Sequence, residues 1–244
     1  MRGLRRILRR MPIPLQNGLR QARGGANRTL RPVDWGNLRR AEPFGERYGY
    51  ERGVPIDRWY VDQFIRRHSV DIAGRVLELL DGRYAKEFGG TAIRSLDILD
   101  IDRRNPDATI VADLGEEGSL PAEHYDCFVL TQTLYLIRDL DTAIQNAWRC
   151  LAKGGVLLIT VPTLVPLDPI HGPDADHWRL TPAGLRQLLR SNTSSEPEIT
   201  SYGNLLTCMG TMLGLAAQDL APDELAVHDS RYPVLTCARL VRMG

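Results

Sequence analysis

Acidic residues that flank successive short apolar runs are the feature that most constrains how this chain can fold. Three runs are followed by Glu78, Asp100 and Asp113, a fourth is preceded by Asp126, and a fifth spans residues 156–159. Short runs rich in Val, Ile and Leu are typical of strands buried on both faces of a parallel sheet. Ligands of open α/β sheets bind outside the carboxyl ends of such strands. Carboxylates at several strand ends therefore predict an adenosine-like ligand, whose ribose hydroxyls and amino group are hydrogen-bond donors.

The order of the apolar runs favours an α/β fold, namely a Rossmann-like doubly wound sheet of about seven strands. The 244 residues fit one such domain with room for a cap. A late apolar run at residues 233–241 follows the segment 201–217, which is consistent with an insertion before an antiparallel strand. We therefore expect a mostly parallel sheet with an antiparallel last strand.

Three segments carry helix signals. Residues 57–68 place apolar side chains at helical spacing, and Asp57 is a candidate N-cap. Residues 139–151 repeat this spacing, and the Lys-Gly-Gly sequence at 153–155 predicts the end of that helix. A threonine–proline pair at 181–182 predicts the start of another helix, because proline suits the first helical position.

Charge divides the chain into a basic start and an acidic remainder. Residues 1–40 contain eleven arginines and one acid, whereas the whole chain has a net charge of +1. Residues 1–11 also place apolar side chains at helical spacing between the arginines, and two prolines shortly after them would end such a helix. We expect a flexible basic tail at 1–30, a lead-in with a cap helix at 31–73, and an α/β domain at 74–244.

The basic tail has three interpretations. A basic amphipathic segment can lie on an anionic membrane or dock on a partner protein. It can equally be a solvated tail, and an arginine-rich, acid-poor start also resembles an organellar transit peptide. Nucleic acid is not an expected partner, because the tail lacks interleaved aromatic residues and the rest of the chain is acidic.

The cysteines and the hydropathy pattern predict a cytoplasmic protein. Cys127, Cys150, Cys208 and Cys237 are scattered, without a C-x-x-C pair, and we expect buried free thiols in a reducing compartment. No apolar run approaches the roughly 18 residues that span a bilayer. No signal-peptide core follows the first arginines, so any membrane contact would be peripheral and through the tail.

Several stretches together resemble class I S-adenosylmethionine-dependent methyltransferases. They are VLE at 76–78, the acids near Asp100, ADL at 112–114, Asp126 and LAKGGVL at 151–157. The resemblance covers roughly residues 74–190. It implies that residues 74–244 are a methyltransferase domain, that S-adenosyl-L-methionine is the cofactor, and that a methyl group is transferred to a nucleophile.

Residues 176–182, which read DHWRLTP, resemble a subgroup whose relatives often accompany glycosyltransferases and glycan assembly. The lead-in stretches at 35–40 and 55–60 also look like that subgroup. This implies a small-molecule or glycan acceptor with a hydroxyl nucleophile. A glycosyltransferase is then a candidate partner for the basic tail.

The resemblance places the cofactor contacts at the strand ends. The candidate residues are Glu78, Asp81, Gly82, Asp100, Asp113, Leu114 and Gln132. Asp100 would bind the ribose hydroxyls, with Asp97 and Asp102 as competitors. Asp113 and Leu114 would flank the adenine, with the carboxylate near its amino group and the leucine against the ring.

The first loop departs from the family pattern, which is normally glycine-rich. Only Gly82 remains, and Arg83 and Tyr84 are bulky. Glu78 would still orient backbone N–H groups near the methionine end of the cofactor, and Asp81 can meet its ammonium group. The altered loop leaves a second hypothesis, a catalytically silent methyltransferase-like protein that binds a ligand or partner.

Two later loops hold the candidates for the chemistry. Gln132 follows the fourth strand, where cofactor and acceptor should meet, unless its segment only caps a helix. His177, which adjoins the subgroup-like residues Asp176 and Arg179, is the first candidate for the general base that takes a proton from an acceptor hydroxyl, and His171 is the second. The same loop has residue types that bind divalent ions, but Asp176 and Arg179 can instead hold the backbone, and we assign no metal.

Two other function classes remain to be weighed. A nicotinamide oxidoreductase is disfavoured, because no G-x-G-x-x-G sequence follows the first strand. A membrane-docked accessory protein that uses the basic tail stays open, since the sequence does not identify the acceptor.

Overall fold

The computed structural model describes residues 14–15, 18, 21, 29–30 and 32–243. The chain divides into two compact units, 1–42 and 43–244. The described part of the first unit includes a 3₁₀ turn, Gly36–Leu38 (η1). The basic amphipathic stripe predicted for residues 1–11 lies outside the described residues.

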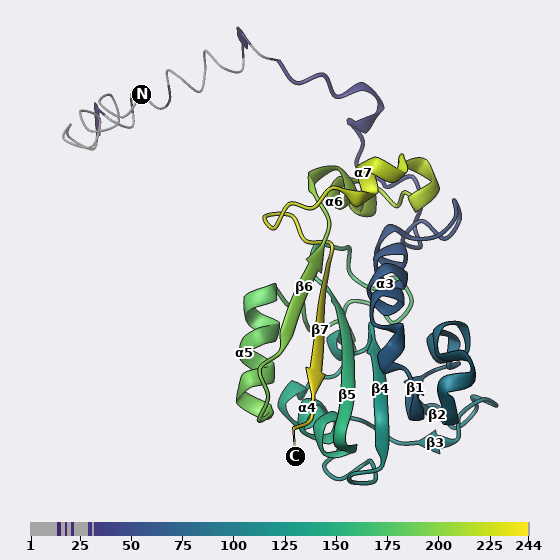
Figure 1. Ribbon diagram of the computed structural model, residues 1–244. Coiled ribbons are helices and arrows are strands. Elements are labelled where there is room, and N and C mark those ends of the chain that lie inside the picture. The colour runs from purple at the N-terminus through teal and green to yellow at the C-terminus, as the bar shows by residue number, and fades with distance from the viewer. Residues whose placement is uncertain (1–13, 16–17, 19–20, 22–28, 31, 244) are drawn as a thin grey trace. The chain divides into compact units, whose positions relative to one another are not determined.

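A seven-stranded sheet forms the centre of the second unit, in the order β3-β2-β1-β4-β5-β7-β6 (Figure 1). The first five strands pair in parallel, and β7 is antiparallel to both β5 and β6. The strands are Gly74–Leu79 (β1), Ile93–Asp100 (β2), Ile110–Val111 (β3), Tyr125–Thr131 (β4), Leu151–Pro162 (β5), Glu198–Tyr202 (β6) and Leu235–Val241 (β7). The predicted mostly parallel sheet with an antiparallel last strand is confirmed.

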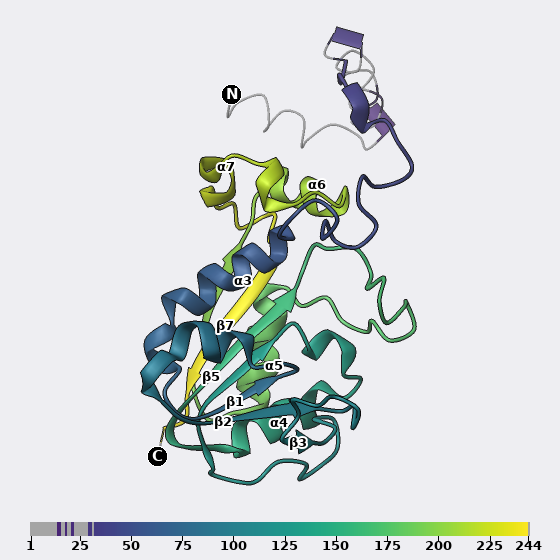
Figure 2. The same cartoon turned by 90° about the vertical axis from the view of Figure 1, so that its right-hand side faces the viewer.

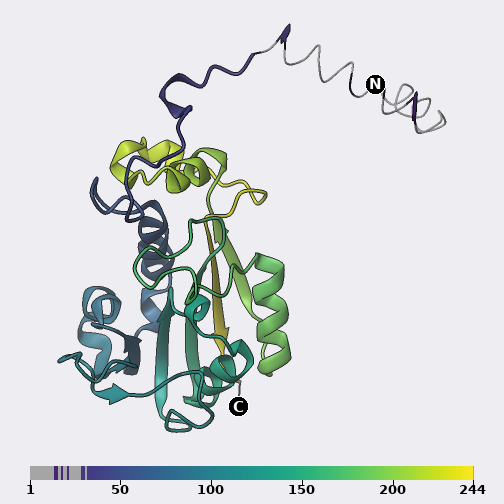
Figure 3. The same cartoon turned by 180° about the vertical axis from the view of Figure 1, so that it is seen from behind.

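Helices Ile56–Arg67 (α3), Leu140–Arg149 (α4) and Pro182–Asn192 (α5) cover the faces of this sheet. Leu205–Met212 (α6) and Pro222–Ala226 (α7) lie beyond the end of the strands (Figure 1). Figures 2 and 3 show α3 on one side of the strands and α5 on the other. Among the described residues, no helix is long and apolar enough to cross a membrane.

Adjacent residues of β4 face the two helical layers, because side chains alternate along a strand. Val129 lies in a buried cluster with Phe64 of α3. Phe128 lies in a second cluster with Ile144 of α4 and Leu185 of α5. The central strands are therefore buried on both faces, as their uninterrupted apolar runs predict.

Local capping sequences fix the starts of α4 and α5. The Asp139 carboxylate accepts a hydrogen bond from the backbone N–H of Thr142 at 3.0 Å. The Thr181 hydroxyl accepts one from the backbone N–H of Gly184 at 3.1 Å, with Pro182 at the first helical position. Both predicted helix starts are confirmed, because each depends on a few neighbouring residues.

The predicted end of α4 is wrong. The helix ends at Arg149, and β5 already begins at Leu151, so the glycines at 154 and 155 lie within the strand. Gly154 has a φ of +80°, and a Cβ on Gly155 would lie 2.8 Å from the Tyr125 carbonyl oxygen. Gly154 thus permits a left-handed backbone conformation, and Gly155 lets β5 pass close to β4 where the register of the pair shifts.

The connections after the first three strands are short turns. Within residues 80–124, all of which the structure describes, there is a π-helical turn, Ala85–Gly89 (η3), and a 3₁₀ turn, Gly90–Ala92 (η4), but no α-helix. Because the carboxyl ends of parallel strands meet at one edge, the loops after β1, β2 and β3 lie side by side there.

All four cysteines are free and buried, as predicted. Burial raises the pKa of the Cys208 thiol to about 11 and that of Cys150 to about 12. Both thiols therefore stay protonated near neutral pH and act as small apolar side chains.

Candidate functional site

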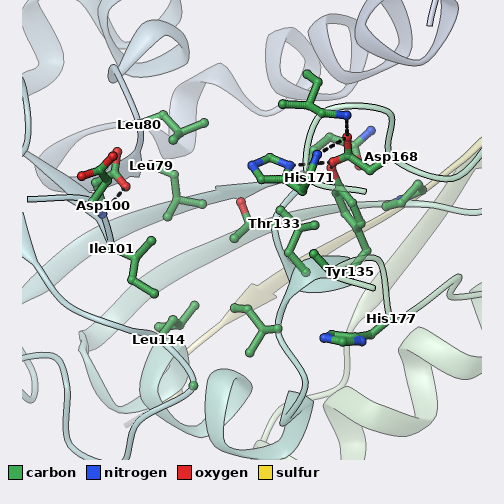
Figure 4. Close-up of a pocket in the computed structure, with 18 of the residues that line it drawn as sticks. Leu79, Leu80, Asp100, Ile101, Leu114, Thr133, Tyr135, Asp168, His171 and His177 are labelled. Carbon is green, nitrogen blue, oxygen red and sulfur yellow. Dashed lines mark hydrogen bonds and ion pairs between the residues drawn. The ribbon is translucent and has the colours of Figure 1, made fainter. Parts of the chain in front are cut away.

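A cavity of about 1000 Å³ lies at the carboxyl ends of β1 to β4. The strand ends, the first turn of α3 and the loop at 163–181 that follows β5 all contribute to its wall. In Figure 4, Asp100 and His171 lie on opposite sides of this cavity, with Thr133 between them. The volume is at the upper end of the roughly 300–1,000 Å³ typical of small-molecule sites, and this edge is where open parallel sheets bind ligands.

The end of β2 presents Asp100 to the cavity. Its carboxylate accepts hydrogen bonds from the backbone N–H of Asp102 at 2.9 Å and from the amide of Asn105 at 2.6 Å. Asp102 also lines the cavity, but its hydrogen bonds with Arg104 lower its pKa to about 2. Asp97 is not in the cavity wall and accepts hydrogen bonds from two hydroxyl groups. Of the three candidate acids for the ribose, Asp100 alone both lines the cavity and is held there by neutral hydrogen-bond donors, without an arginine partner.

The residues after β3 form an adjoining part of the wall. Asp113 accepts a hydrogen bond from the backbone N–H of Gly115 at 2.7 Å. Leu114 is 4% exposed and belongs to the buried cluster that also contains Leu99. A carboxylate and an apolar side chain thus stand together at the cavity, the combination expected beside an adenine ring.

The loop after β1 is held by Glu78. This side chain is 1% exposed, and its two oxygens accept hydrogen bonds from the backbone N–H groups of Tyr84 at 2.8 Å and Ala85 at 2.6 Å. Burial raises the pKa of Glu78 to about 7. Gly82 has a φ of +64°, and a Cβ there would lie 2.4 Å from a methyl carbon of Ile98. The loop is therefore fixed in one conformation by a buried acid and a required glycine.

The predicted residues of this loop lie beside the cavity and do not line it. Glu78, Asp81 and Gly82 are absent from the wall, whereas Leu79 and Leu80 are part of it. Leu80 adopts a φ of +65°, which a non-glycine residue rarely does. Leu80 therefore faces the cavity at a position where a G-x-G-x-G loop that keeps Gly82 has a glycine.

Gln132, at the end of β4, meets Asp57 in the cavity wall. The amide nitrogen of Gln132 donates to the Asp57 carboxylate at 3.1 Å, and both residues are nearly buried. The prediction that Asp57 caps α3 is wrong: the helix begins at Ile56, its cap residue is Pro55, and no side chain caps it. Asp57 lies inside the first turn instead, which directs its carboxylate to a partner far along the chain.

Arg58 follows Asp57 and also lines the cavity. Burial lowers the pKa of its guanidinium, but the neighbouring Asp57 carboxylate and Tyr84 hydroxyl outweigh burial and raise it. Tyr48 lines the same region, and burial together with nearby carboxylates raises the pKa of its hydroxyl. This end of the cavity therefore holds both signs of charge.

His171 is oriented by a buried acid. Its Nδ1 atom lies 2.8 Å from the Asp168 carboxylate, which also accepts a hydrogen bond from the Tyr135 hydroxyl at 2.8 Å. Asp168 is 3% exposed, whereas half of the His171 side chain is exposed. Burial raises the pKa of Asp168, but these hydrogen bonds and two from backbone N–H groups outweigh it and lower the pKa below its usual value. An ionised Asp168 favours the tautomer in which Nδ1 is protonated and Nε2 is free to accept a proton.

His177 lies on the same loop, and no acid among the described residues pairs with its ring as Asp168 does with His171. Its backbone N–H donates to the Tyr135 carbonyl at 2.8 Å, and Figure 4 shows its ring apart from Asp168. The neighbouring Asp176 and Arg179 form an ion pair, and Arg179 also donates to the Pro166 carbonyl at 2.7 Å. Asp176 and Arg179, the ion pair within the DHWRLTP stretch at 176–182, therefore hold the loop backbone.

The structure brings most of the predicted site residues together. Six line the one cavity: Asp100, Asp113, Leu114, Gln132, His171 and His177. Sequence analysis missed five others that share it: Tyr48, Asp57, Arg58, Tyr135 and Asp168. Their only local signal is the charged pair Asp57-Arg58 two residues after Pro55, because tertiary packing alone brings them to the site. Among the described residues, no three His, Cys, Asp or Glu side chains are grouped to hold a metal ion.

Comparison with known proteins agrees with this architecture. Residues 61–159 match the family model described as a methyltransferase domain. No curated protein sequence matches the chain.

Solved structures share the fold. The N-methyltransferase NodS from Bradyrhizobium japonicum, in complex with S-adenosyl-L-homocysteine, is 15% identical, with a TM-score of 0.51 over 82% of this chain and 93% of that one. A SAM-dependent methyltransferase from Archaeoglobus fulgidus is 15% identical, with a TM-score of 0.50 over 75% and 94%. The [4+2]-cyclase SpnF is 15% identical, with a TM-score of 0.53 over 83% and 87%. One fold thus supports different reactions, and the acceptor must be argued from the site.

Residues 61–159 therefore match a methyltransferase domain, and the sheet has the Rossmann-like fold of the compared structures. The cavity fits S-adenosylmethionine in three respects. It is large enough, it has an acid held by neutral donors at the end of β2, and it has an acid beside a buried leucine after β3.

Proposed function

We propose that this protein transfers a methyl group from S-adenosylmethionine to a hydroxyl of a small-molecule or glycan acceptor. The observation that carries the proposal is the pairing of His171 with buried Asp168 in the same cavity as Asp100 and Asp113. A general base oriented by an acid is what a hydroxyl nucleophile requires, since its proton must leave as the new bond forms.

The strand-end residues would hold the adenosine part of the cofactor. Asp100 would accept hydrogen bonds from the ribose hydroxyls, and Asp113 and Leu114 would flank the adenine. When bound, the cofactor supplies a methyl group already activated on a sulfonium, so catalysis depends largely on alignment. The rest of the cavity is then available to the acceptor.

The loop after β5 would provide the base. Nε2 of His171 takes the proton of the acceptor hydroxyl, while Asp168 holds Nδ1–H and stabilises the positive ring that results. The Tyr135 hydroxyl donates a hydrogen bond to the same Asp168 oxygen and fixes its direction. Geometry favours His171 over His177 for this role, because Asp168 orients the ring of His171.

The closest competing proposal is a silent domain that binds a ligand without turnover. Leu80 in the cavity wall, in place of a glycine, is the observation in its favour. Both proposals require the same cofactor site, so turnover has to separate them.

The test is a transfer assay with the full-length protein and methyl-labelled S-adenosylmethionine. The acceptor panel contains free sugars, nucleotide sugars, lipid-linked glycans and matched amines. We expect a labelled methyl ether with at least one hydroxyl acceptor and loss of that product in His171→Gln. Label on amines alone, or binding of the cofactor without transfer to any acceptor, would contradict the proposal.

A further inference from the structure

Two buried oxygen atoms in the cavity wall lack a hydrogen-bond partner among the described residues. They are one carboxylate oxygen of Asp57 and the amide oxygen of Gln132. The two residues are 8% and 7% exposed, and both line the cavity. A buried acceptor without a donor is costly, so this pair is suited to a ligand that brings hydrogen-bond donors.

A positive group stands beside these acceptors. Arg58 is the next residue of the same helical turn, lines the same cavity, and lies near the Asp57 carboxylate. Guanidinium groups bind carboxylates strongly and with defined geometry. A carboxylate with a free oxygen next to a guanidinium matches a zwitterion, whose ammonium meets the acid and whose carboxylate meets the arginine.

The order of the strands places this charged pair at one end of an elongated site. Asp113 follows β3 and Asp100 ends β2, while Gln132 follows β4 on the far side of β1. β2 and β4 are two strand spacings apart, roughly 10 Å. A ligand with its adenosine at β3 and β2 therefore extends its tail across β1 toward Gln132 and Asp57.

The conformation of Gln132 supports a binding role. Its φ is +47°, a left-handed value that is uncommon for a residue other than glycine. Its backbone N–H donates to the Thr160 carbonyl at 2.9 Å, which holds the strained residue in place. Backbone strain of this kind is concentrated at ligand and active sites.

We infer that Asp57, Arg58 and Gln132 bind the amino-acid end of the cofactor, with Asp57 and Gln132 accepting from its ammonium and Arg58 binding its carboxylate. This inference rests on the proposed cofactor site. It also accounts for the altered loop after β1, because the first turn of α3 supplies the contacts that the loop cannot make with Leu80 in place of a glycine.

Calorimetry with two related ligands tests the inference. S-adenosyl-L-homocysteine carries the amino-acid end, whereas 5′-methylthioadenosine shares the adenosine and the sulfur but lacks that end. In Arg58→Met and Asp57→Asn of the full-length protein, affinity for the first ligand should fall roughly 10- to 100-fold, as for a lost hydrogen bond to a charged group. Affinity for the second should change less than about twofold, within the scatter of a surface substitution.

Arg104→Met is the matched control, because Arg104 lines the same cavity near Asp100 and pairs with Asp102. Any effect of this control should be equal for the two ligands. Equal losses for both ligands in Arg58→Met and Asp57→Asn, or no loss for either, would overturn the inference while leaving the cofactor site intact. No binding of S-adenosyl-L-homocysteine to the unsubstituted protein would overturn the proposed function and the inference together.

Discussion

The two sides of the cavity are built in different ways. Its strand-end side is formed by Asp100, the last residue of β2, and by Asp113 and Leu114, which come within three residues of the end of β3. Its loop side is formed by residues from the first turn of α3, the end of β4 and the long loop after β5: Asp57, Arg58, Gln132, Asp168 and His171. The sheet alone positions the first set, whereas the second set depends on side-chain hydrogen bonds between segments far apart in the chain.

This difference teaches where recognition and chemistry reside. The strand-end side offers acids held by neutral donors, which suits a constant part of the ligand such as adenosine. The loop side offers an oriented histidine and both signs of charge. We therefore expect substitutions on the strand-end side to change binding, and substitutions on the loop side to change turnover or the binding of charged groups.

The largest expected effect separates the two histidines of the loop side. His171→Ala should lower turnover roughly 10²–10⁴-fold with cofactor affinity nearly unchanged, because it removes the general base. His177→Ala, whose ring lacks the acid that orients His171, should stay within about threefold of the unsubstituted protein. Steady-state kinetics with the acceptor found in the transfer assay measure both. A full loss in His177→Ala with activity retained in His171→Ala would reverse the assignment.

The next effect concerns the ion pair between Asp176 and Arg179, which holds the loop after β5. Arg179→Met leaves the buried Asp176 carboxylate without its ion-pair partner, which costs about 3–5 kcal/mol of stability when a charge stays buried. Thermal unfolding should show a marked fall in melting temperature. Arg104→Met, at an exposed ion pair, should leave the melting temperature nearly unchanged. Equal melting temperatures for the two variants would mean that the ion pair does not hold the loop.

The third effect is a pH dependence that belongs to the loop after β1. The pKa of Glu78 is about 7 when folded against 4.5 in its ordinary state. The folded state thus binds the Glu78 proton more tightly than the unfolded state does. The resulting contribution to the unfolding free energy is complete below pH 4.5 and is lost as pH rises to about 7. Glu78→Gln should reduce the fall in unfolding free energy between pH 4.5 and 7.5 by roughly 3 kcal/mol. Parallel stability curves for the two proteins would place the Glu78 pKa near its ordinary value.

A smaller effect tests the strand-end side. Asp113→Ala should weaken S-adenosyl-L-homocysteine and 5′-methylthioadenosine equally, by about 1–3 kcal/mol, because both ligands share the adenine. Calorimetry measures both constants. A loss of affinity confined to S-adenosyl-L-homocysteine would mean that Asp113 does not contact the adenine, and would contradict the proposed division between the two sides.

The smallest effect on the fold lies outside both sides. Deleting residues 1–15 should leave the melting temperature within about 1 °C, since helices and strands of the sheet unit begin after residue 43. The same deletion should reduce binding to anionic vesicles at low salt, because it removes five arginines. Vesicle binding that is unchanged by the deletion would remove the basic tail as a membrane contact.

The sequence predicts the fold well, because the fold depends on local and periodic signals. The apolar runs of the central strands, the helix start at residue 139 and the Thr181-Pro182 start are found where expected. The end of α4 is not, since the glycines at 154 and 155 serve a close approach of two strands, which only the register of β4 and β5 reveals.

The site is predicted on one side only. Asp100 and Asp113 are identified by their position after apolar runs, and the sheet brings them to one edge. Asp57 has the residue type and position of a helix cap, so the sequence predicts a local role. Its actual partner, Gln132, is 75 residues away and cannot be predicted from neighbouring residues. Asp168 orients His171 only because Tyr135 and the loop pack around it. The hydrophobic periodicity of the sequence does not indicate hydrogen bonds between segments that are far apart in the chain.

A crystal structure of the full-length protein with S-adenosyl-L-homocysteine tests the central claim most directly. The account predicts one ligand in the cavity, with the ribose at Asp100, the adenine beside Asp113 and Leu114, and the amino-acid end at Asp57 and Arg58. A ligand bound elsewhere, or bound in this cavity with its adenosine at α3 and its amino-acid end at β2, would contradict it.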